Sequence, residues 1–376
     1  MRIERRLRQP RWLMLVVPAA SFLFALVLAG IVLLATGHDP LSTYRQLFDA
    51  AFLQAGALGQ TLTQATPLAF TGLAAAIAFR MRLFNVGGEG QLYIGTITAA
   101  AAGLLLGGSG GPSALVIGAM VIAGCAGGAA WALIPGLLRA FFKTNEIITS
   151  LMLNYVAGTL LTYLVFYSES YWRLTTGTNA RVFPTSKPLP GSAIWPGLTI
   201  HAQGGILLPL GAGIAVLVAL ILWLLNSRTR FGFEVLVLGD SVRAGRYAGM
   251  RVRRKILAVM ALSGAVAGLG GASQVGDFAH AIDGDPNGLQ KQYYGYTGIV
   301  VAALARYNPL AVVVVAFLIG GLQQAGNTLE GADFPSGLVG VLQGIILFSA
   351  LGGELLVRYR IRFGRRRAVP ARGAVA

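Results

Sequence analysis

The stretch WLMLVVPAASFLFALVLAGIVLLATG, from Trp12 to Gly37, contains 26 residues and no charged side chain. A helix needs about 20 consecutive apolar residues to cross the hydrocarbon core of a bilayer, so this stretch is long enough to span a membrane. It also exceeds the apolar core of a signal peptide, which has about 7–15 residues, and no small-residue cleavage pattern precedes the loop at Gly37. We therefore expect it to remain in the protein as a membrane anchor.

Similar runs recur along the 376 residues, of which 55% are apolar and 12% are charged, with a mean hydropathy of +0.67. A soluble domain carries about 25% charged residues. The sequence therefore predicts an all-α integral membrane protein with about ten transmembrane helices, although the eighth, with fourteen residues, is short for a full crossing and is either half of a hairpin or a re-entrant element. The predicted spans are residues 12–36, 56–79, 86–106, 113–138, 147–167, 204–226, 256–274, 292–305, 309–325 and 336–356.

The basic residues predict the orientation, because Lys and Arg concentrate on the cytoplasmic side of membrane proteins. With ten spans and a cytoplasmic N-terminus, 25 of the 30 Lys and Arg residues fall on the cytoplasmic side. Both termini are then cytoplasmic: a basic N-terminus (1–11) and an Arg-rich tail (358–376) flank the transmembrane domain (12–357). Residues 168–203, which include four prolines, form an extracytoplasmic cap, and residues 227–255 form a long basic loop on the cytoplasmic side.

Several functional classes are excluded or disfavoured. The net charge of +16 is clustered between apolar runs, with no aromatic-interleaved basic face, so we expect no nucleic-acid partner. The only cysteine, Cys125, lies in an apolar run, and the three histidines fall in separate loops, so no metal site, disulfide or catalytic dyad is predicted. No phosphate-binding P-loop and no selectivity filter occur, so we expect no ATP site or cofactor in this chain and disfavour a channel. Active transport would take its energy from another subunit.

Charged and amide side chains inside a bilayer usually face a cavity or a partner helix. Glu89 follows the cytoplasmic Arg82 by seven residues, in the run Asn85-Val86-Gly87-Gly88-Glu89-Gly90-Gln91. Three glycines in four positions disfavour regular helix, and a broken helix presents backbone groups to a substrate in many transporters. We therefore interpret this run as a cavity or gate element; the alternative is a close helix contact in which Glu89 caps a helix.

A second polar group climbs the fifth predicted span. Glu146, Ser150 and Asn154 are spaced four residues apart and therefore share one helix face that points inward. Asn154 lies near the middle of the membrane, and together with Tyr155 it is the strongest candidate for contact with a polar solute. The alternative is an amide that is hydrogen-bonded to another helix.

The second predicted span adds Gln60 and Gln64 on one face, just before Pro67, which we expect to break the helix and line an access path from the outer side. Amides and aromatic rings suit a neutral polar ligand such as a sugar or a nucleobase. Further amides occur late in the chain, at Gln323, Gln324, Asn327 and Gln343. The predicted substrate pathway comprises Gln60, Gln64, Asn85, Glu89, Gln91, Glu146, Ser150, Asn154 and Tyr155.

The cytoplasmic loop 227–255 has the composition of a docking element. Asp240 or Ser241 can cap a short helix that ends at Gly249, and two turns of exposed helix fit a groove of a partner subunit. The alternative is a plain basic loop. The residues assigned to docking are Gly239, Asp240, Ser241, Arg243, Ala244, Arg246, Tyr247, Ala248 and Gly249.

Three motifs in this order resemble the permease subunits of bacterial ATP-binding cassette (ABC) importers for nucleosides and simple sugars, a group related to the ribose-type permeases. They are Phe84 to Gln91 (FNVGGEGQ), Thr144 to Tyr155 (TNEIITSLMLNY) and the loop from Arg228 to Met250, which looks like the family's coupling-helix loop. The sequence departs from the family pattern at Gly88, where alanine is commoner, and at Ser241-Val242, where Asn-Pro often opens the coupling helix.

The resemblance implies a complex in the bacterial inner membrane. Its partners would be two ATPase subunits that bind ATP and Mg, an extracytoplasmic substrate-binding protein or lipoprotein, and a second, non-identical permease. The FNVGGEGQ form favours the nucleoside branch over the ribose type but leaves the solute open. The alternative function is an ion-coupled secondary transporter of a neutral polar solute, which Glu89 alone among the carboxylates would serve, and a structural or sensory scaffold is a further alternative.

Overall fold

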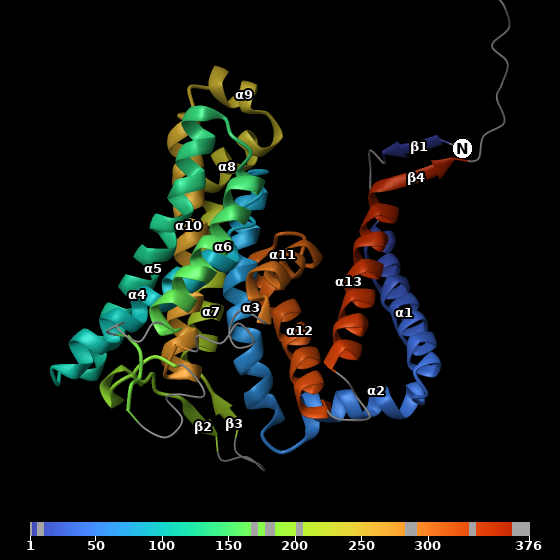
Figure 1. The fold of residues 1–376 in the computed structure, drawn as a ribbon. Helices are drawn as coiled ribbons and strands as arrows, with labels where there is room; N and C mark the ends of the chain where they lie inside the picture. The colour runs from blue at the N-terminus through green and yellow to red at the C-terminus, as the bar shows by residue number, and fades with distance from the viewer. Residues whose placement is uncertain are drawn as a thin grey trace, which may run out of the picture. The chain divides into compact units, whose positions relative to one another are not determined.

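The structure is a computed structural model that describes residues 2–5, 11–166, 172–176, 185–200, 206–282, 292–330 and 336–362 (Figure 1). Much of the predicted cytoplasmic tail 358–376 and of the cap 168–203, together with His201, lies outside the described residues, as does the side chain of Gln343. The chain forms two compact units, one made of Met1–Tyr44 and Gly337–Ala376 and the other of Arg45–Ser336.

Unit 1 joins the two ends of the chain. It contains α1 (Arg11–Ala35), most of α13 (Ser336–Arg358) and the first part of α2 (Pro40–Phe48). The strands β1 (Arg2–Arg5) and β4 (Tyr359–Arg362) pair antiparallel, with Arg2 opposite Arg362. A Cβ atom on Gly353 would overlap the Ser21 hydroxyl, so α1 and α13 pack closely. Residues 2–5 and 359–362 therefore lie side by side.

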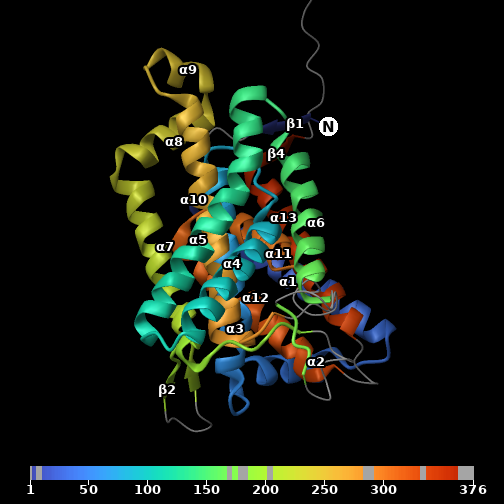
Figure 2. The same ribbon diagram turned by 60° about the vertical axis from the view of Figure 1, so that its left-hand side comes forward.

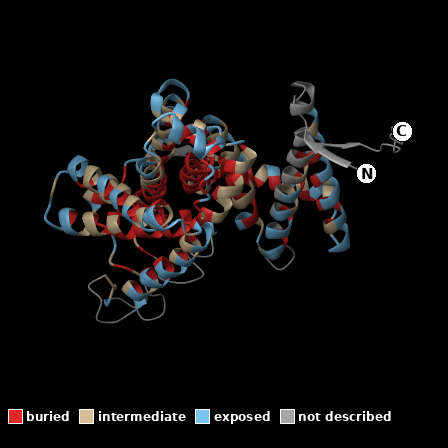
Figure 3. Cartoon of the chain, turned by 90° about the horizontal axis from the view of Figure 1, so that it is seen from above, coloured by how far each residue is buried: buried red, intermediate tan, exposed pale blue. Residues whose placement is uncertain are grey.

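Unit 2 is a bundle whose centre is formed by α3 (Ala57–Arg80) and α10 (Val252–Ser273), which continues as a π-helical turn, η5 (Gln274–Ala279). Around them lie α4 (Gly88–Gly108), α5 (Ser113–Leu137), which continues as the π-helical turn η2 (Leu138–Phe142), α6 (Glu146–Phe166), α7 (Leu210–Arg228) and α12 (Pro309–Leu329). In the apolar stretch of α3, 83% of the residues are buried, whereas in that of α5 with η2 only 22% are buried. Figure 3 shows the same division between buried inner helices and exposed outer ones.

Small residues set the closest helix contact of unit 2, between α5 and α10. A Cβ atom on Gly268 would overlap the carbonyl oxygen of Gly124, and one on Gly264 would overlap that of Gly128. Without a hydrophobic driving force between helices in lipid, such close backbone approach supplies the packing energy. Gly124, Gly128, Gly264 and Gly268 are therefore packing residues.

The all-helical membrane fold predicted from the sequence is confirmed. Nine of the ten predicted spans coincide with helices of 19 residues or more. Seven helices within the described residues are long and apolar enough to cross a membrane, and an eighth is counted if the bent pair Leu23–Ala35 and Pro40–Leu53 is one span.

The eighth predicted span, residues 292–305, is wrong as a full helical crossing, and its alternative as a half-length element is correct. α11 (Tyr294–Leu304) has eleven residues, which is about 16 Å of helix against a core about 30 Å thick. It begins at mid-depth, where the Thr71 hydroxyl donates to the Tyr294 carbonyl at 2.8 Å. It ends near the tip of α3, where the rings of Tyr307 and Phe79 lie 5.7 Å apart.

The predicted break at Pro67 does not occur, because α3 is helical from Ala57 to Arg80. The Thr66 hydroxyl donates to the Leu62 carbonyl at 2.6 Å, and Thr63 donates to Gly59 at 3.0 Å. These are intrahelical bonds to the preceding turn, so the threonines around Pro67 fit a continuous helix.

The two long connections lie at opposite ends of unit 2 (Figures 1 and 2). One end carries α8 (Arg230–Asp240) and α9 (Val242–Tyr247), and the other carries η4 (Gly191–Ala193), β2 (Leu198–Ile200) and β3 (Ile206–Leu208). The second end is ordered by backbone hydrogen bonds, including Trp195 to Gly276 at 3.0 Å and Leu189 to His280 at 2.8 Å. This arrangement suits the predicted opposite sidedness of the two segments.

We predict that Gly268→Ala destabilises the protein by about 1–3 kcal/mol, because the new methyl group would force α5 and α10 apart. Thermal unfolding of the detergent-solubilised protein measures the effect. Gly118→Ala on α5 is the matched control, because a Cβ atom there meets no atom within 4 Å. Equal melting temperatures for the two variants would contradict the packing role.

Candidate functional site

A non-helical segment between α3 and α4 lies at the centre of the candidate site. Arg82 has a φ of 57°, which turns the chain out of α3, and α4 begins at Gly88. The predicted interruption is present over residues 83–87 and includes Gly87, whereas Gly88 to Gln91 form the first turn of α4 and are helical, contrary to the prediction. Close approach requires glycine at Gly90, where a Cβ atom would lie 2.9 Å from Asn154 Oδ1, and at Gly295, where one would overlap the Glu89 backbone.

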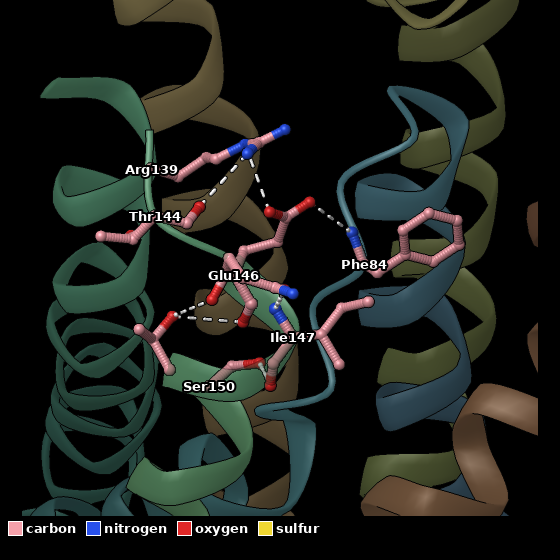
Figure 4. Close-up of polar contacts among 8 residues, drawn as sticks. Phe84, Arg139, Thr144, Glu146, Ile147 and Ser150 are labelled. Carbon is pink, nitrogen blue, oxygen red and sulfur yellow. Dashed lines mark hydrogen bonds and ion pairs between the residues drawn. The ribbon is translucent and has the colours of Figure 1, made fainter. Parts of the chain in front are cut away.

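The polar stripe of α6 holds this segment, and Figure 4 shows the contact of its first member, Glu146, with Phe84. Glu146 Oε1 accepts from the Phe84 amide at 3.5 Å, and Ser150 Oγ accepts from the Val86 amide at 3.2 Å. Asn154 Oδ1 accepts from the Gly90 amide at 2.9 Å, while its Nδ2 donates to the Val86 carbonyl at 2.9 Å. The inward orientation of the stripe is thus confirmed, and its partner is the backbone of residues 84–90.

Arg139 neutralises Glu146, the first residue of the stripe. Its Nε atom lies 3.2 Å from Glu146 Oε2, and its Nη1 donates to the Thr144 carbonyl at 3.2 Å. The Glu146 side chain is 7% exposed, so this ion pair is largely shielded from solvent (Figure 4). From the sequence, Arg139 was only one of the basic residues expected on the cytoplasmic side. Its position seven residues before Glu146, across the turn at Lys143, could have indicated an ion pair.

Asn85 and Gln91 form a closed amide network inside the bundle. Asn85 Nδ2 donates to Gln91 Oε1 at 3.0 Å and to Ser263 Oγ at 2.9 Å, and Gln91 Nε2 donates back to Asn85 Oδ1 at 2.9 Å. The Ser263 hydroxyl donates to the Ala74 carbonyl at 2.7 Å. All of these side chains are buried, so the network ties α3, α4 and α10 together.

Glu89 caps the N-terminus of α11. Its Oε2 atom accepts from the backbone amides of Gly295 and Tyr296, and its Oε1 accepts from the Tyr93 hydroxyl at 2.6 Å. A carboxylate at this position interacts favourably with the positive end of the helix dipole. Asn154 similarly caps α4 through the Gly90 amide. Two helix N-termini therefore meet at mid-depth, each capped by a side chain from another helix, with Gly88 against Gly295 between them.

Three tyrosines border this junction on the exposed face of the chain, and we call them the tyrosine group: Tyr155, Tyr293 and Tyr296. Tyr155 is 66% exposed and Tyr293 is 57% exposed, and the rings of Tyr293 and Tyr296 lie 6.2 Å apart. Asn154 Nδ2 donates to the Tyr296 hydroxyl at 3.1 Å and so orients that ring. Tyr155 follows Asn154 directly on α6.

The tyrosine group lies beside the middle part of α3. Thr71, which binds the first residue of α11, is nine residues from the end of α3 at Arg80, or about 14 Å along the helix. Sequence reasoning selected Tyr155 but missed Tyr293 and Tyr296. The signal was the run Tyr293-Tyr294-Gly295-Tyr296 at the start of a span that was already too short.

The amides of α3 divide between two environments. Gln64 Oε1 accepts from the buried Tyr294 hydroxyl at 2.8 Å, which places it beside the junction. Gln60 lies one helical turn away and is exposed. On α12, Gln324 Nε2 donates to the Thr328 hydroxyl at 2.9 Å within its own helix.

The predicted docking helix exists and begins where the sequence placed its cap. Ser241 Oγ accepts from the Ala244 amide at 3.2 Å, and Gly249, with a φ of 75°, follows the end of α9. Asp240 ends α8 and pairs with Arg82 at 3.2 Å. Tyr247 is 94% exposed at the tip of the structure. The remaining predicted docking residues Arg243, Ala244, Arg246 and Ala248 are exposed, but Gly239 is buried against the end of α3, where a Cβ atom would overlap the Arg80 carbonyl.

Residues 57–351 match the family model described as the permease component of the branched-chain amino acid transport system. The chain belongs to this permease family. The match covers the central helices, the junction and the α8–α9 segment, and it confirms the resemblance drawn from the three motifs.

Curated relatives match almost the whole chain. The glucose ABC transporter permease protein TsgB13 of Haloferax volcanii is 33% identical over 97% of this chain and 95% of its own length. The guanosine ABC transporter permease protein NupP of Bacillus subtilis is 32% identical, over 93% of this chain and 95% of its own. The nucleoside ABC transporter permease protein NupB of Lactococcus lactis is 30% identical, over 88% and 89%. This permease is therefore similar to subunits named for both sugars and nucleosides.

We predict that Asn154→Leu lowers the melting temperature of the purified permease. The change leaves the Gly90 amide and the Val86 carbonyl without their side-chain partner, and a buried unpaired polar group costs about 1–3 kcal/mol. Tyr155→Ala is the control, because it alters an adjacent but exposed side chain of α6. If both variants melt at the wild-type temperature, Asn154 does not hold the segment.

Proposed function

We propose that this permease is the membrane subunit of an ABC importer that carries nucleosides into the cytoplasm, with simple sugars as the second substrate class. The tyrosine group carries the proposal, because it presents aromatic faces and hydroxyls at mid-depth without a free charge. Glu89, the carboxylate nearest to it, is occupied by the α11 N-terminus. A neutral solute that stacks and forms hydrogen bonds matches this chemistry.

The polar junction behind the tyrosines would position them rather than bind solute directly. Both Nδ2 hydrogens of Asn154 are already donated, to Val86 and Tyr296, and Asn85 and Gln91 satisfy one another. The substrate surface in this proposal consists of the tyrosine group, with Gln60 and Gln64 along the path from the outer end. Of the other predicted pathway residues, Asn85, Glu89, Gln91, Glu146, Ser150 and Asn154 would act as its support.

A second permease would cover the tyrosine group. Tyr155 and Tyr293 are mostly exposed at a depth where their hydroxyls would otherwise meet lipid hydrocarbon, and polar groups in hydrocarbon are costly. A solute path between two permease subunits removes that cost. A non-identical second permease is the version that we propose, as the nucleoside branch of the family implies.

ATP would be bound and hydrolysed by partner ATPase subunits, with this chain contributing no catalytic residue. The excess of basic residues at the α8–α9 end supports a cytoplasmic location for that end, where exposed α9 would dock on the ATPase. The opposite end, with η4 and β2, would receive the substrate-binding protein. The complex would lie in the cytoplasmic membrane, which in a bacterium is the inner membrane.

A continuous set of contacts would connect docking to the substrate site. Asp240, at the end of α8, pairs with Arg82, and the segment after Arg82 leads to α4 and its Glu89 cap on α11. Glu234 pairs with Lys255, so α8 is also tied to the start of α10. Movement of α9 would therefore reach the junction through packed elements.

We predict that Tyr155→Ala and Tyr296→Ala weaken the apparent affinity for nucleoside uptake. Loss of one stacking partner costs about 1–3 kcal/mol, or about 5- to 150-fold. Uptake of labelled guanosine and glucose by cells expressing the full complex measures the effect and chooses between the substrates. Tyr163→Ala, two turns farther along α6 and 53% exposed, is the matched control. An equal effect at Tyr163, or none at the tyrosine group, would remove that group from the pathway.

We predict that Tyr247→Ala reduces the amount of ATPase that co-purifies with the permease at least severalfold, because an exposed aromatic anchor at the tip of α9 is lost. Tyr247→Phe keeps the ring and should retain the ATPase. Quantifying the ATPase in the eluate of the tagged permease is the measurement. Undiminished recovery with Tyr247→Ala would show that α9 docks through other residues or not at all.

A further inference from the structure

A cleft with a volume of about 1060 Å³ opens at the α8–α9 end of unit 2. Its walls come from the turn after α3 (Met81 to Leu83), η2, the α8–α9 corner and the start of α10. The volume is at the upper end of the range of sites for small ligands, about 300–1,000 Å³. No part of the proposed transport pathway accounts for it.

The charges that line the cleft are strongly unbalanced. Its walls carry seven basic residues and one carboxylate, Asp240. Asp240 pairs with Arg82, and Glu146 pairs with Arg139, so two of the seven are neutralised. The other five have no carboxylate within 4.0 Å in the part of the chain that the structure describes. They are Lys143, Arg246, Arg251, Arg253 and Arg254.

Part of the lining of the cleft is apolar. Its lining includes Leu238, Val252 and Ile256, and Phe141, which is 50% exposed, lies under the Arg253 guanidinium at 5.2 Å. The neighbouring Phe142 is 75% exposed. These two rings add exposed apolar surface next to the basic residues of the cleft, which suits contact with acyl chains.

We propose that this cleft binds the phosphate-bearing headgroup of an anionic phospholipid from the leaflet that faces α9. Basic pockets between membrane helices on the cytoplasmic side bind acidic lipid headgroups. The apolar part of the lining favours a lipid over free phosphate, because only the lipid also has acyl chains that can lie beside Phe141 and Phe142. The bound headgroup would bridge η2 to the α9–α10 corner and so steady the docking helix.

The test is native mass spectrometry of the full permease complex in mild detergent, titrated with phosphatidylglycerol and, separately, with phosphatidylcholine. Wild type should retain phosphatidylglycerol preferentially. Arg251→Gln combined with Arg254→Gln should weaken this binding about thirtyfold, because each cationic side chain near an acidic lipid contributes about a fivefold factor. Thermal unfolding should be unchanged, since both side chains are exposed.

The matched control is Arg228→Gln with Arg230→Gln, which removes the same charge from exposed residues at the same end but outside the cleft. It should leave phosphatidylglycerol binding near the wild-type value. Equal losses in the two double variants would overturn the proposal in favour of general surface charge. Displacement of the lipid by millimolar inorganic phosphate, or its exclusion when the ATPase is bound, would also overturn it, in favour of a free-anion site or a protein contact.

Discussion

The capped meeting of the α4 and α11 N-termini is the constraint on which the rest of the candidate site depends. Two positive helix ends in a low-dielectric bundle repel unless each receives a compensating acceptor. Glu89 supplies one to α11 and Asn154 supplies the other to α4. Glu89 reaches these amides because Gly295 has no Cβ atom, which would overlap the Glu89 backbone.

The stripe on α6 extends this constraint to the end of the bundle. Residues 84–90 have no helical partners for much of their backbone, and unsatisfied backbone groups are costly in a membrane. Glu146, Ser150 and Asn154 satisfy them at successive turns of one helix. Arg139 forms an ion pair with Glu146 in the first turn of α6. Side chains of α6 thus supply hydrogen bonds that the irregular segment does not make within a helix.

The sequence predicted the helices well because apolar runs and the bilayer thickness determine them directly. It predicted the start of α9 for a similar reason, since a serine cap acts on its own helix. It was less specific where the partner lies far along the chain. The alternative interpretation of Glu89, as a helix cap in a close helix contact, is correct, but the sequence did not identify the capped helix because Gly295 is 206 residues away. The break predicted at Pro67 was wrong because a proline inside a long apolar helix does not by itself end that helix.

The polar groups where α4 meets α11 are already hydrogen-bonded to one another, and this constrains how transport can occur. Rotating α11 against α4 would separate the buried Glu89 from its two amides, and Gly295 lies directly against the Glu89 backbone. Tyr293 and Tyr296 are therefore fixed to α4 through α11, and Tyr155 is fixed to the same body through Asn154, its neighbour on α6. The tyrosine group then moves as one surface. Alternating access in the proposed importer follows most directly from movement between subunits, with this chain contributing a rigid wall.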